Sequence, residues 1–273
     1  PPGVIERNRR EWRMTNLFLR IAFLHLAPLP GAVAQNRHLL TRAITQAACA
    51  GAGWILTPEL AVSGYTFADT IGTRWIEPQP DHWMRKICSL AARLRVTLFL
   101  SQPEQDPGSR QLHNTLFAIG PNGRIAGRHR KINALRVGSE AWSTPGTAAT
   151  AFPLAPFGPI GLLICADAYT PGIAKSLKAQ GATVLVSSAA WAPGLHGPNG
   201  EWERCTADTG LPLFVCNRTG PDRTLDFRSA ESVVAQGGKR LFSLSCEQSA
   251  IFLIDWDLAA GAPASTHYQR MLL

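Results

Sequence analysis

Short apolar runs and amphipathic stretches alternate along most of the chain, beginning with a run from Leu17 to Leu26 that predicts a first strand. Apolar residues then recur at helical spacing between Leu39 and Ala48, and the run "WIL" that follows predicts a second strand. The plan repeats as a helix from Asp81 to Leu94 and a strand from Val96 to Leu100. This alternation is typical of a layered α/β domain.

The middle and the end of the chain predict hairpins as well as crossovers. The turn sequence "PNG" separates "LHNTLFAIG" from "GRIAGRHRK", which predicts an antiparallel hairpin whose second arm ends at Lys131. The apolar run "GLLI" predicts a strand that ends at Cys165, and a helix follows from Pro171. Later elements are the strand "TVLVSSAAW", the helix "GEWERCTADTG", the strand "LPLFVCN" and three short final strands.

The segment "MTNLFLRIAFLHLAPLPGAVAQ" has an apolar middle and an A-x-A ending, as a secretory signal does. Arg20 and His25 interrupt its apolar run and Pro28 ends it early, so we favour a first strand. Because no run of 18 or more apolar residues is present, the sequence predicts no membrane-spanning segment and no membrane partner. Residues 1–14, which include the charged stretch "ERNRREWR", are expected to form an N-terminal extension.

Composition and charge exclude several classes of function. Apolar residues make up 45% and charged residues 17% of the 273 residues, which is typical of a globular protein. The net charge is +8, but the basic residues are scattered and not interleaved with aromatic ones, so nucleic acid is not an expected partner. The six cysteines form no C-x-x-C pair for zinc and no dense disulfide framework, which favours a reducing, cytoplasmic compartment.

Three chemically reactive residues fall where predicted strands end: Glu59, Lys131 and Cys165. Loops at the carboxyl ends of strands are where α/β folds collect their sites. A thiol needs a base or a cation to become a nucleophile, and Glu59 is suited to accept its proton while Lys131 stabilises an oxyanion. The alternative interpretation is structural: a core cysteine, a helix-capping or ion-paired glutamate, and a surface lysine.

Three segments together resemble the nitrilase, or carbon-nitrogen hydrolase, superfamily. Glu59 lies within "AGAGWILTPELAVSGYTF", which is similar to that family's apolar strand followed by P-E and G-Y. Lys131 lies within "LHNTLFAIGPNGRIAGRHRKINAL", which resembles its N-T, G-x-I and Y-R-K-x-H-L pattern. Cys165 lies within "GPIGLLICADAYTPGIAKSLKAQGATVLVSSAAW", which resembles its G-x-x-I-C-x-D run. The similarity continues through "GEWERCTADTGLPLFVCNRTG" and covers most of residues 15–256.

The resemblance implies a four-layer α-β-β-α sandwich for a carbon-nitrogen hydrolase domain over residues 15–273. It also implies homodimers or larger assemblies paired through a helical face, and chemistry without a metal or an organic cofactor. By the same resemblance Cys165 is the nucleophile, Glu59 the general base and Lys131 the oxyanion-stabilising cation. Glu140 occupies the place of a second glutamate that positions substrate, unless it is an exposed loop carboxylate. A backbone N–H near Ala166 is expected to meet the oxyanion.

Three positions depart from the family pattern. His129 replaces the tyrosine of Y-R-K, Asn133 replaces the histidine after the lysine, and Gly172 takes the place of an acid after the cysteine. His129 and Asn133 fall close to the expected site, so we expect them to change the shape and hydrogen bonding of the pocket. For His129 we favour a satisfied polar residue beside the core over a catalytic one.

These features predict an amidohydrolase that cleaves a non-peptide C–N bond of a small amide through a thioester on Cys165. The open alternatives are a nitrilase, an N-carbamoyl amidohydrolase, an acyltransferase and a non-catalytic binding protein on the same scaffold. Ala166 and Asp167 after the cysteine are closer to the C-x-D of amidase branches than to the W-E of nitrilases. Aromatic residues that follow the motifs are candidates for an apolar substrate pocket: Tyr65, Phe67, Trp142 and, foremost, Trp191.

Overall fold

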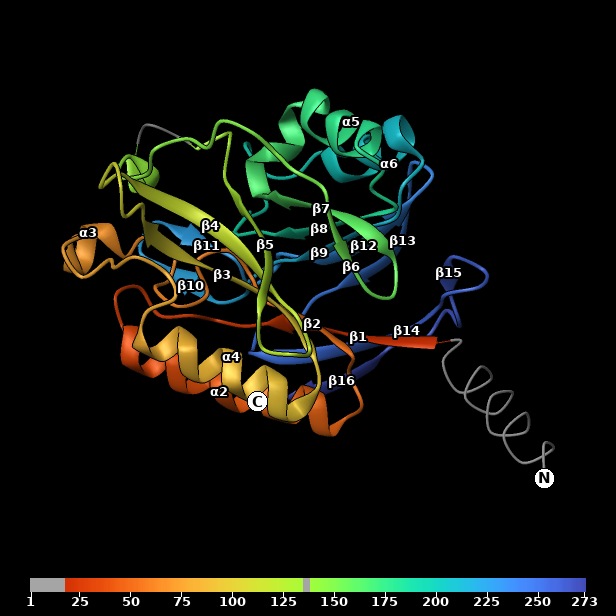
Figure 1. The fold of residues 1–273 in the computed structure, drawn as a ribbon, viewed down its shortest axis with the longest axis horizontal. Coiled ribbons are helices and arrows are strands. Elements are labelled where there is room, and N and C mark those ends of the chain that lie inside the picture. Colours follow the sequence, from red (N-terminus) through yellow and green to blue (C-terminus); the bar gives the residue numbers. More distant parts are fainter. Residues whose placement is uncertain (1–17, 135–137) are drawn as a thin grey trace.

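The structure, a computed structural model, describes residues 18–134 and 138–273. Two large β-sheets pack face to face, and helices cover the outer face of each sheet (Figure 1). This four-layer arrangement confirms the predicted α-β-β-α sandwich. The expected N-terminal extension, residues 1–14, lies outside the described residues.

The first sheet is mixed, with a parallel centre and antiparallel flanks. Its eight strands in spatial order are β15 (Ala262–Pro263), β14 (Ala250–Asp257), β1 (Phe18–His25), β2 (Trp54–Leu56), β3 (Thr97–Gln105), β4 (Leu112–Ile119) and β5 (Ile125–Arg130), with β16 (Gln269–Leu272) also paired to β14. Because β4 and β5 form an antiparallel hairpin, β5 runs in the same direction as β2 and β3. The hairpin predicted around "PNG" is therefore confirmed.

The second sheet has six strands and a parallel centre of its own. In spatial order they are β13 (Lys239–Leu244), β12 (Ser232–Gln236), β9 (Leu213–Cys216), β8 (Val184–Ser188), β7 (Gly158–Ile164) and β6 (Phe152–Leu154). A separate two-stranded ribbon consists of β10 (Pro221–Asp222) and β11 (Leu225–Asp226).

Two long helices, α2 (Val33–Cys49) and α4 (His82–Leu94), cover the first sheet, while α5 (Pro171–Ala179) and α6 (Glu201–Thr209) cover the second (Figure 1). A short helix, α3 (Ala68–Ile71), ends the loop that follows β2 and contains Glu59. The side chain of Asp81 accepts the N–H of Met84 at 2.7 Å and so caps α4 where the sequence predicts its start.

Side chains of β1 alternate between two hydrophobic cores. Ile21 and Phe23 join the core between the sheets, whereas Ala22 and Leu24 join the core beneath α2 and α4. This period of two is what a strand covered on both faces requires. Because β1 pairs with β14 on one side and β2 on the other, residues 18–25 of the segment with a signal-like composition form a central strand.

The largest difference from the prediction is the length of β3, which continues past Leu100 to Gln105. Its last residues are polar but mostly buried, and they pair one by one with β4 as far as Gln105 opposite Leu112. The strand end predicted from apolar residues alone, Leu100, is therefore five residues too early. The unpredicted elements α3, β6, β10, β11, β15 and β16 contain two to four residues each, too few to carry a periodic signal.

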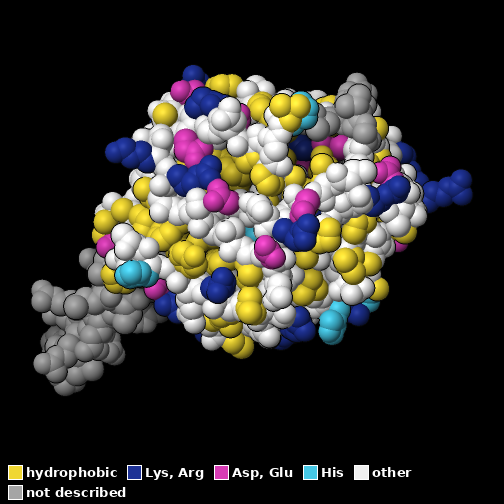
Figure 2. Space-filling model, turned by 180° about the vertical axis from the view of Figure 1, so that it is seen from behind, with side chains coloured by type: hydrophobic (Ala, Val, Ile, Leu, Met, Phe, Trp, Pro, Cys, Tyr) yellow, Lys and Arg dark blue, Asp and Glu magenta, His cyan; other side chains and the backbone are white. Residues whose placement is uncertain are grey.

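The surface charge agrees with the scattered pattern of the sequence. On the face shown in Figure 2, Lys and Arg side chains are spread out and several lie beside Asp or Glu. No helix in the described ranges is long and apolar enough to cross a lipid bilayer.

Candidate active site

The predicted catalytic residues lie where strands of both sheets end. Glu59 lies three residues after β2, Lys131 directly follows β5, and Cys165 directly follows β7. Because β2 and β5 run in the same direction, their carboxyl ends meet at one edge of the first sheet. The side chains of Glu59, Lys131, Glu140 and Cys165 are all buried, so the alternatives of a surface lysine and an exposed loop carboxylate do not hold.

Lys131 joins the two glutamates. Its Nζ lies 2.7 Å from Glu59 Oε1 and 2.9 and 2.8 Å from the two carboxylate oxygens of Glu140. Glu140 belongs to a turn of 3₁₀ helix, Gly138–Glu140, in the loop that follows Lys131. One ammonium therefore holds two buried carboxylates that come from different loops.

Two further groups orient the carboxylates. Asn114, which the quoted "HNT" sequence contains, donates from Nδ2 to Glu59 at 2.7 Å and to Glu140 at 2.9 Å. The N–H of Ala190, two residues after β8, donates to the other oxygen of Glu59 at 2.9 Å. Glu59 is thus fixed by groups from both sheets. Neither group was predicted from the sequence, although Asn114 lies in the N-T pattern that resembles the family.

The charges of the cluster set the protonation of its members. Burial lowers the pKa of Lys131, but the attraction of Glu59 and Glu140 outweighs it and raises that pKa well above its ordinary value, so the ammonium is retained. Burial and the nearby Glu59 carboxylate raise the pKa of Cys165 well above its ordinary value, although Lys131 opposes them. Burial also raises the pKa of Glu140. The resting cysteine is therefore a thiol that needs a base to become a nucleophile.

Cys165 has a strained backbone. Its φ angle is +45°, in the left-handed region that residues with a side chain rarely adopt. The residue begins a 3₁₀ turn, Cys165–Tyr169, directly after β7. A sharp bend between a strand and a helical turn holds the side chain at the end of the strand, where Cys165 lines a cavity, and this position suits a nucleophile.

The turn after Cys165 is fastened by Asp167. One carboxylate oxygen of Asp167 accepts the N–H groups of Ile132 at 3.0 Å and Asn133 at 2.9 Å. The other accepts the N–H of Ile164 at 2.9 Å and lies 2.7 Å from Nε2 of His129. The loop that carries Lys131 and the turn that carries Cys165 are therefore joined through one buried side chain.

The departures from the family pattern have distinct surroundings. His129 is buried beside the core as predicted, but only half of its ring is satisfied: Nε2 contacts Asp167, whereas Nδ1 has no hydrogen-bond partner among the described residues. Asn133 donates to the carbonyl of Ala166 at 2.9 Å and to Oγ1 of Thr170 at 2.8 Å. Gly172 lies exposed in the first turn of α5, where Pro171 begins the helix.

Lys131 and Cys165 open into a cavity of about 620 Å³. Of the predicted substrate-binding residues, Tyr65, Ala166 and Trp191 line it. Trp142 instead packs against Phe67, with ring centroids 5.0 Å apart. Besides these and the two catalytic residues, the described lining consists of residues that were not predicted from the sequence: Tyr169, Ala190, Leu225 and the loop residues 192–197.

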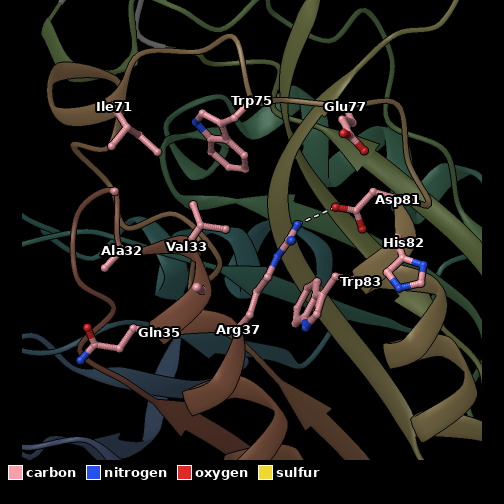
Figure 3. A pocket seen from close by; sticks show the side chains of 12 residues that line it. Ala32, Val33, Gln35, Arg37, Ile71, Trp75, Glu77, Asp81, His82 and Trp83 are labelled. Carbon is pink, nitrogen blue, oxygen red and sulfur yellow. Dashed lines mark hydrogen bonds and ion pairs between the residues drawn. The ribbon is translucent and has the colours of Figure 1, made fainter.

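A second cavity, of about 750 Å³, opens beside the start of α2 (Figure 3). Arg37 points into it, with its guanidinium 5.0 Å from the ring centroid of Trp83 and Nη2 2.5 Å from Asp81 Oδ2. None of the predicted catalytic residues lines this cavity. In the part of the chain that the structure describes, no three His, Cys, Asp or Glu side chains gather as a metal-binding group.

Comparisons with known proteins agree with this fold. The sequence matches the carbon-nitrogen hydrolase family over residues 20–267. It is 26% identical over 222 residues to a probable nitrilase of Schizosaccharomyces pombe, covering 78% of this chain and 79% of that protein. It is 30% identical over 159 residues to an omega-amidase of Mus musculus, covering 54% of this chain and 56% of that protein.

Among solved structures, a mutant of the Nesterenkonia AN1 amidase from the nitrilase superfamily superposes with a TM-score of 0.74 at 23% identity, covering 88% of this chain and 91% of that one. The two chains therefore share one fold although fewer than a quarter of their aligned residues are identical. Since the family match spans nearly the whole chain, the protein belongs to the carbon-nitrogen hydrolase family of hydrolytic enzymes.

Proposed function

We propose that this enzyme is an amidohydrolase that cleaves a non-peptide amide through a thioester on Cys165. One observation carries the proposal: Lys131, held by Glu59 and Glu140, opens together with Cys165 into a single cavity. A cation and a thiol that line one substrate-sized space, with a carboxylate in contact with the cation, support this proposal, because acyl transfer to sulfur needs a nucleophile, a base and an oxyanion-stabilising group.

In the first half of the reaction, Glu59 takes the proton of the Cys165 thiol as the sulfur attacks the amide carbonyl carbon. The carbonyl oxygen becomes an oxyanion, and Lys131 and a backbone N–H near Ala166 stabilise it. Glu59 then gives its proton to the amide nitrogen, the C–N bond breaks, and ammonia or an amine leaves. The acyl group remains on sulfur as a thioester.

In the second half, Glu59 removes a proton from water, which attacks the thioester carbon. The oxyanion forms again at the same place, the C–S bond breaks, and the sulfur recovers its proton from Glu59. The carboxylic acid leaves and the thiol is restored. Glu140 holds Lys131 and, through it, the position of the oxyanion.

Nitrile hydrolysis is the main alternative. Of the two relatives described above, one is named a probable nitrilase and the other an omega-amidase. A nitrile passes first through a thioimidate on sulfur. An amide must expel a protonated amine, which suits a second carboxylate such as Glu140 beside the acid-base group. N-carbamoyl amide hydrolysis and acyl transfer would use the same nucleophile. A binding protein without activity is disfavoured because Glu59, Lys131 and Cys165 are all present.

The test compares an amide and a nitrile that have the same side chain, measuring ammonia release from each. We expect a clearly higher kcat/KM for the amide and no release with Cys165→Ala. Faster hydrolysis of the nitrile would refute the amidase assignment but leave the thiol mechanism standing.

We further propose that the whole of residues 15–273 forms the hydrolase domain and that the protein self-associates through a helical face, as its family resemblance implies. A monomer at micromolar concentration in light scattering would contradict self-association. We also propose a reducing, cytoplasmic compartment, since all six cysteines are free thiols in the structure.

A further inference from the structure

The mouth of the catalytic cavity carries apolar side chains that are unusually exposed. Leu195 is 95%, Tyr169 51% and Leu225 37% exposed, and all three line the cavity. We name these three residues the apolar collar. Exposed apolar side chains are ordinary when they are single, but a group around one cavity marks a surface that meets a ligand.

Aromatic rings, among them that of Tyr169 from the collar, form one wall of the cavity. The rings of Tyr169 and Trp191 lie 4.9 Å apart, and Trp191 packs edge-on against the buried Trp202 at 5.4 Å. Trp191 Nε1 and the Tyr169 hydroxyl both donate to the carbonyl of His196, at 2.7 and 3.4 Å. Because these polar atoms already have a partner, the wall offers a ligand mainly ring carbon.

The lining provides little to hold a charged substrate. Among the described lining residues, Lys131 is the only lysine or arginine. Its charge is already paired with the carboxylates of Glu59 and Glu140. No aspartate or glutamate is among those lining residues either. A carboxylate or ammonium on the substrate would lose hydration without gaining an ion pair from these described lining residues, which is costly.

The cavity is also large for a small amide. Acetamide has four heavy atoms, which at roughly 30 Å³ each, the share of one water in the liquid, would fill roughly a fifth of the space. Cavities of about 620 Å³ suit ligands of a dozen or more heavy atoms.

We propose that the substrate is a primary amide with a neutral, apolar acyl group that extends from Cys165 to the apolar collar. This inference rests on the proposed amidohydrolase function and narrows its substrate. It separates the enzyme from hydrolases of N-carbamoyl amino acids or carboxylated amides, whose substrates carry an anion.

The first experiment measures kcat/KM for unbranched primary amides from acetamide to octanamide, with adipamate as the charged twin of hexanamide. In adipamate a carboxylate replaces the terminal methyl group. We expect kcat/KM to rise about fourfold per methylene, the effect of burying one methylene, and hexanamide to exceed adipamate about a hundredfold. A flat series, or a preference for adipamate, would overturn the inference while amide hydrolysis still stood. If no amide releases ammonia, the proposed function itself fails.

The second experiment changes the collar. In the double variant Leu195→Ser and Leu225→Ser, the ratio of kcat/KM for octanamide to that for acetamide should fall about tenfold. Folding is not at stake, because both side chains are already exposed. The matched control is Leu272→Ser, which changes a leucine that is 60% exposed and does not line the cavity. An unchanged ratio in the double variant would overturn the role of the collar.

Discussion

Replacing Lys131 by arginine tests the central feature of the site, a compact ammonium between two carboxylates. Its Nζ makes three short contacts, at 2.7 Å to Glu59 and at 2.9 and 2.8 Å to the two carboxylate oxygens of Glu140. A guanidinium keeps the charge but is planar and larger, and the position is 1% exposed between two buried carboxylates, so the larger group cannot take the place of the ammonium between them. The nitrogen that faces the cavity would be displaced.

Loss of one oxyanion donor costs about 3 to 4 kcal/mol of transition-state stabilisation, which corresponds to a hundredfold to thousandfold fall in kcat. We therefore expect Lys131→Arg to lower kcat by about a hundredfold or more. Lys131→Met is a different perturbation, because it leaves Glu59 and Glu140 buried without their cation. Breaking such a buried pair costs about 3–5 kcal/mol, a large part of the 5–15 kcal/mol that stabilises a typical domain.

The assay is ammonia release at saturating amide, with thermal unfolding by circular dichroism measured on the same samples. Lys175→Arg is the matched control, because Lys175 is 56% exposed and pairs with Asp208 at 3.1 Å on the surface. It should leave both kcat and Tm unchanged. If Lys131→Arg folds normally and keeps a near-normal kcat, Lys131 is structural and our account of the oxyanion is wrong.

Three other changes give distinct outcomes. Cys165→Ala should abolish turnover with an unchanged circular dichroism spectrum, and activity within about tenfold of the original would exclude the thiol mechanism. Glu140→Gln should lower kcat for amides more than it raises KM, because Glu140 holds Lys131 rather than the substrate; a change in KM alone would contradict this. Burial lowers the pKa of His25 from 6.5 to about 4. Between pH 6.5 and about 4, His25 therefore binds a proton in the unfolded chain but not in the folded one. Stability should therefore fall by roughly 3 kcal/mol as the pH drops through that window. His25→Phe should remove this part of the slope in thermal unfolding, and an unchanged slope would show that other groups cause it.

Much of the fold was predictable because most elements carry a strong local signal. The apolar runs of β7 and β8 and the turn between β4 and β5 can be recognised without knowing their partners. The order of strands in each sheet cannot, because it depends on contacts between distant segments. β1 pairs with β14, so that Phe18 lies opposite Asp257, and no periodicity in either segment identifies the other.

The candidate site shows the same division. Glu59 and Lys131 were recognisable from residue type and position at strand ends, whereas Glu140 came from the family resemblance; the three side chains do lie in contact. The N–H of Ala190 was not predictable, since every residue other than proline has one and only the chain path decides which N–H faces Glu59. Trp142 and Tyr169 make a similar point. Both are aromatic residues near motifs, but only the second lines the catalytic cavity.

The two departures nearest the nucleophile act on the same turn. A residue with a side chain at positive φ costs about 1–3 kcal/mol and persists only when its surroundings hold it. Around Cys165 that hold comes from Asp167 and from Asn133, which fastens the carbonyl of Ala166. An ionised aspartate only accepts hydrogen bonds, so Nε2 of His129 donates in their contact. Burial raises the pKa of Asp167, but His129 and the N–H groups of Asn133 and Ile164 together outweigh burial and lower it. Where the family has a tyrosine hydroxyl, this chain therefore has a ring N–H that ties β5 to the turn of the nucleophile.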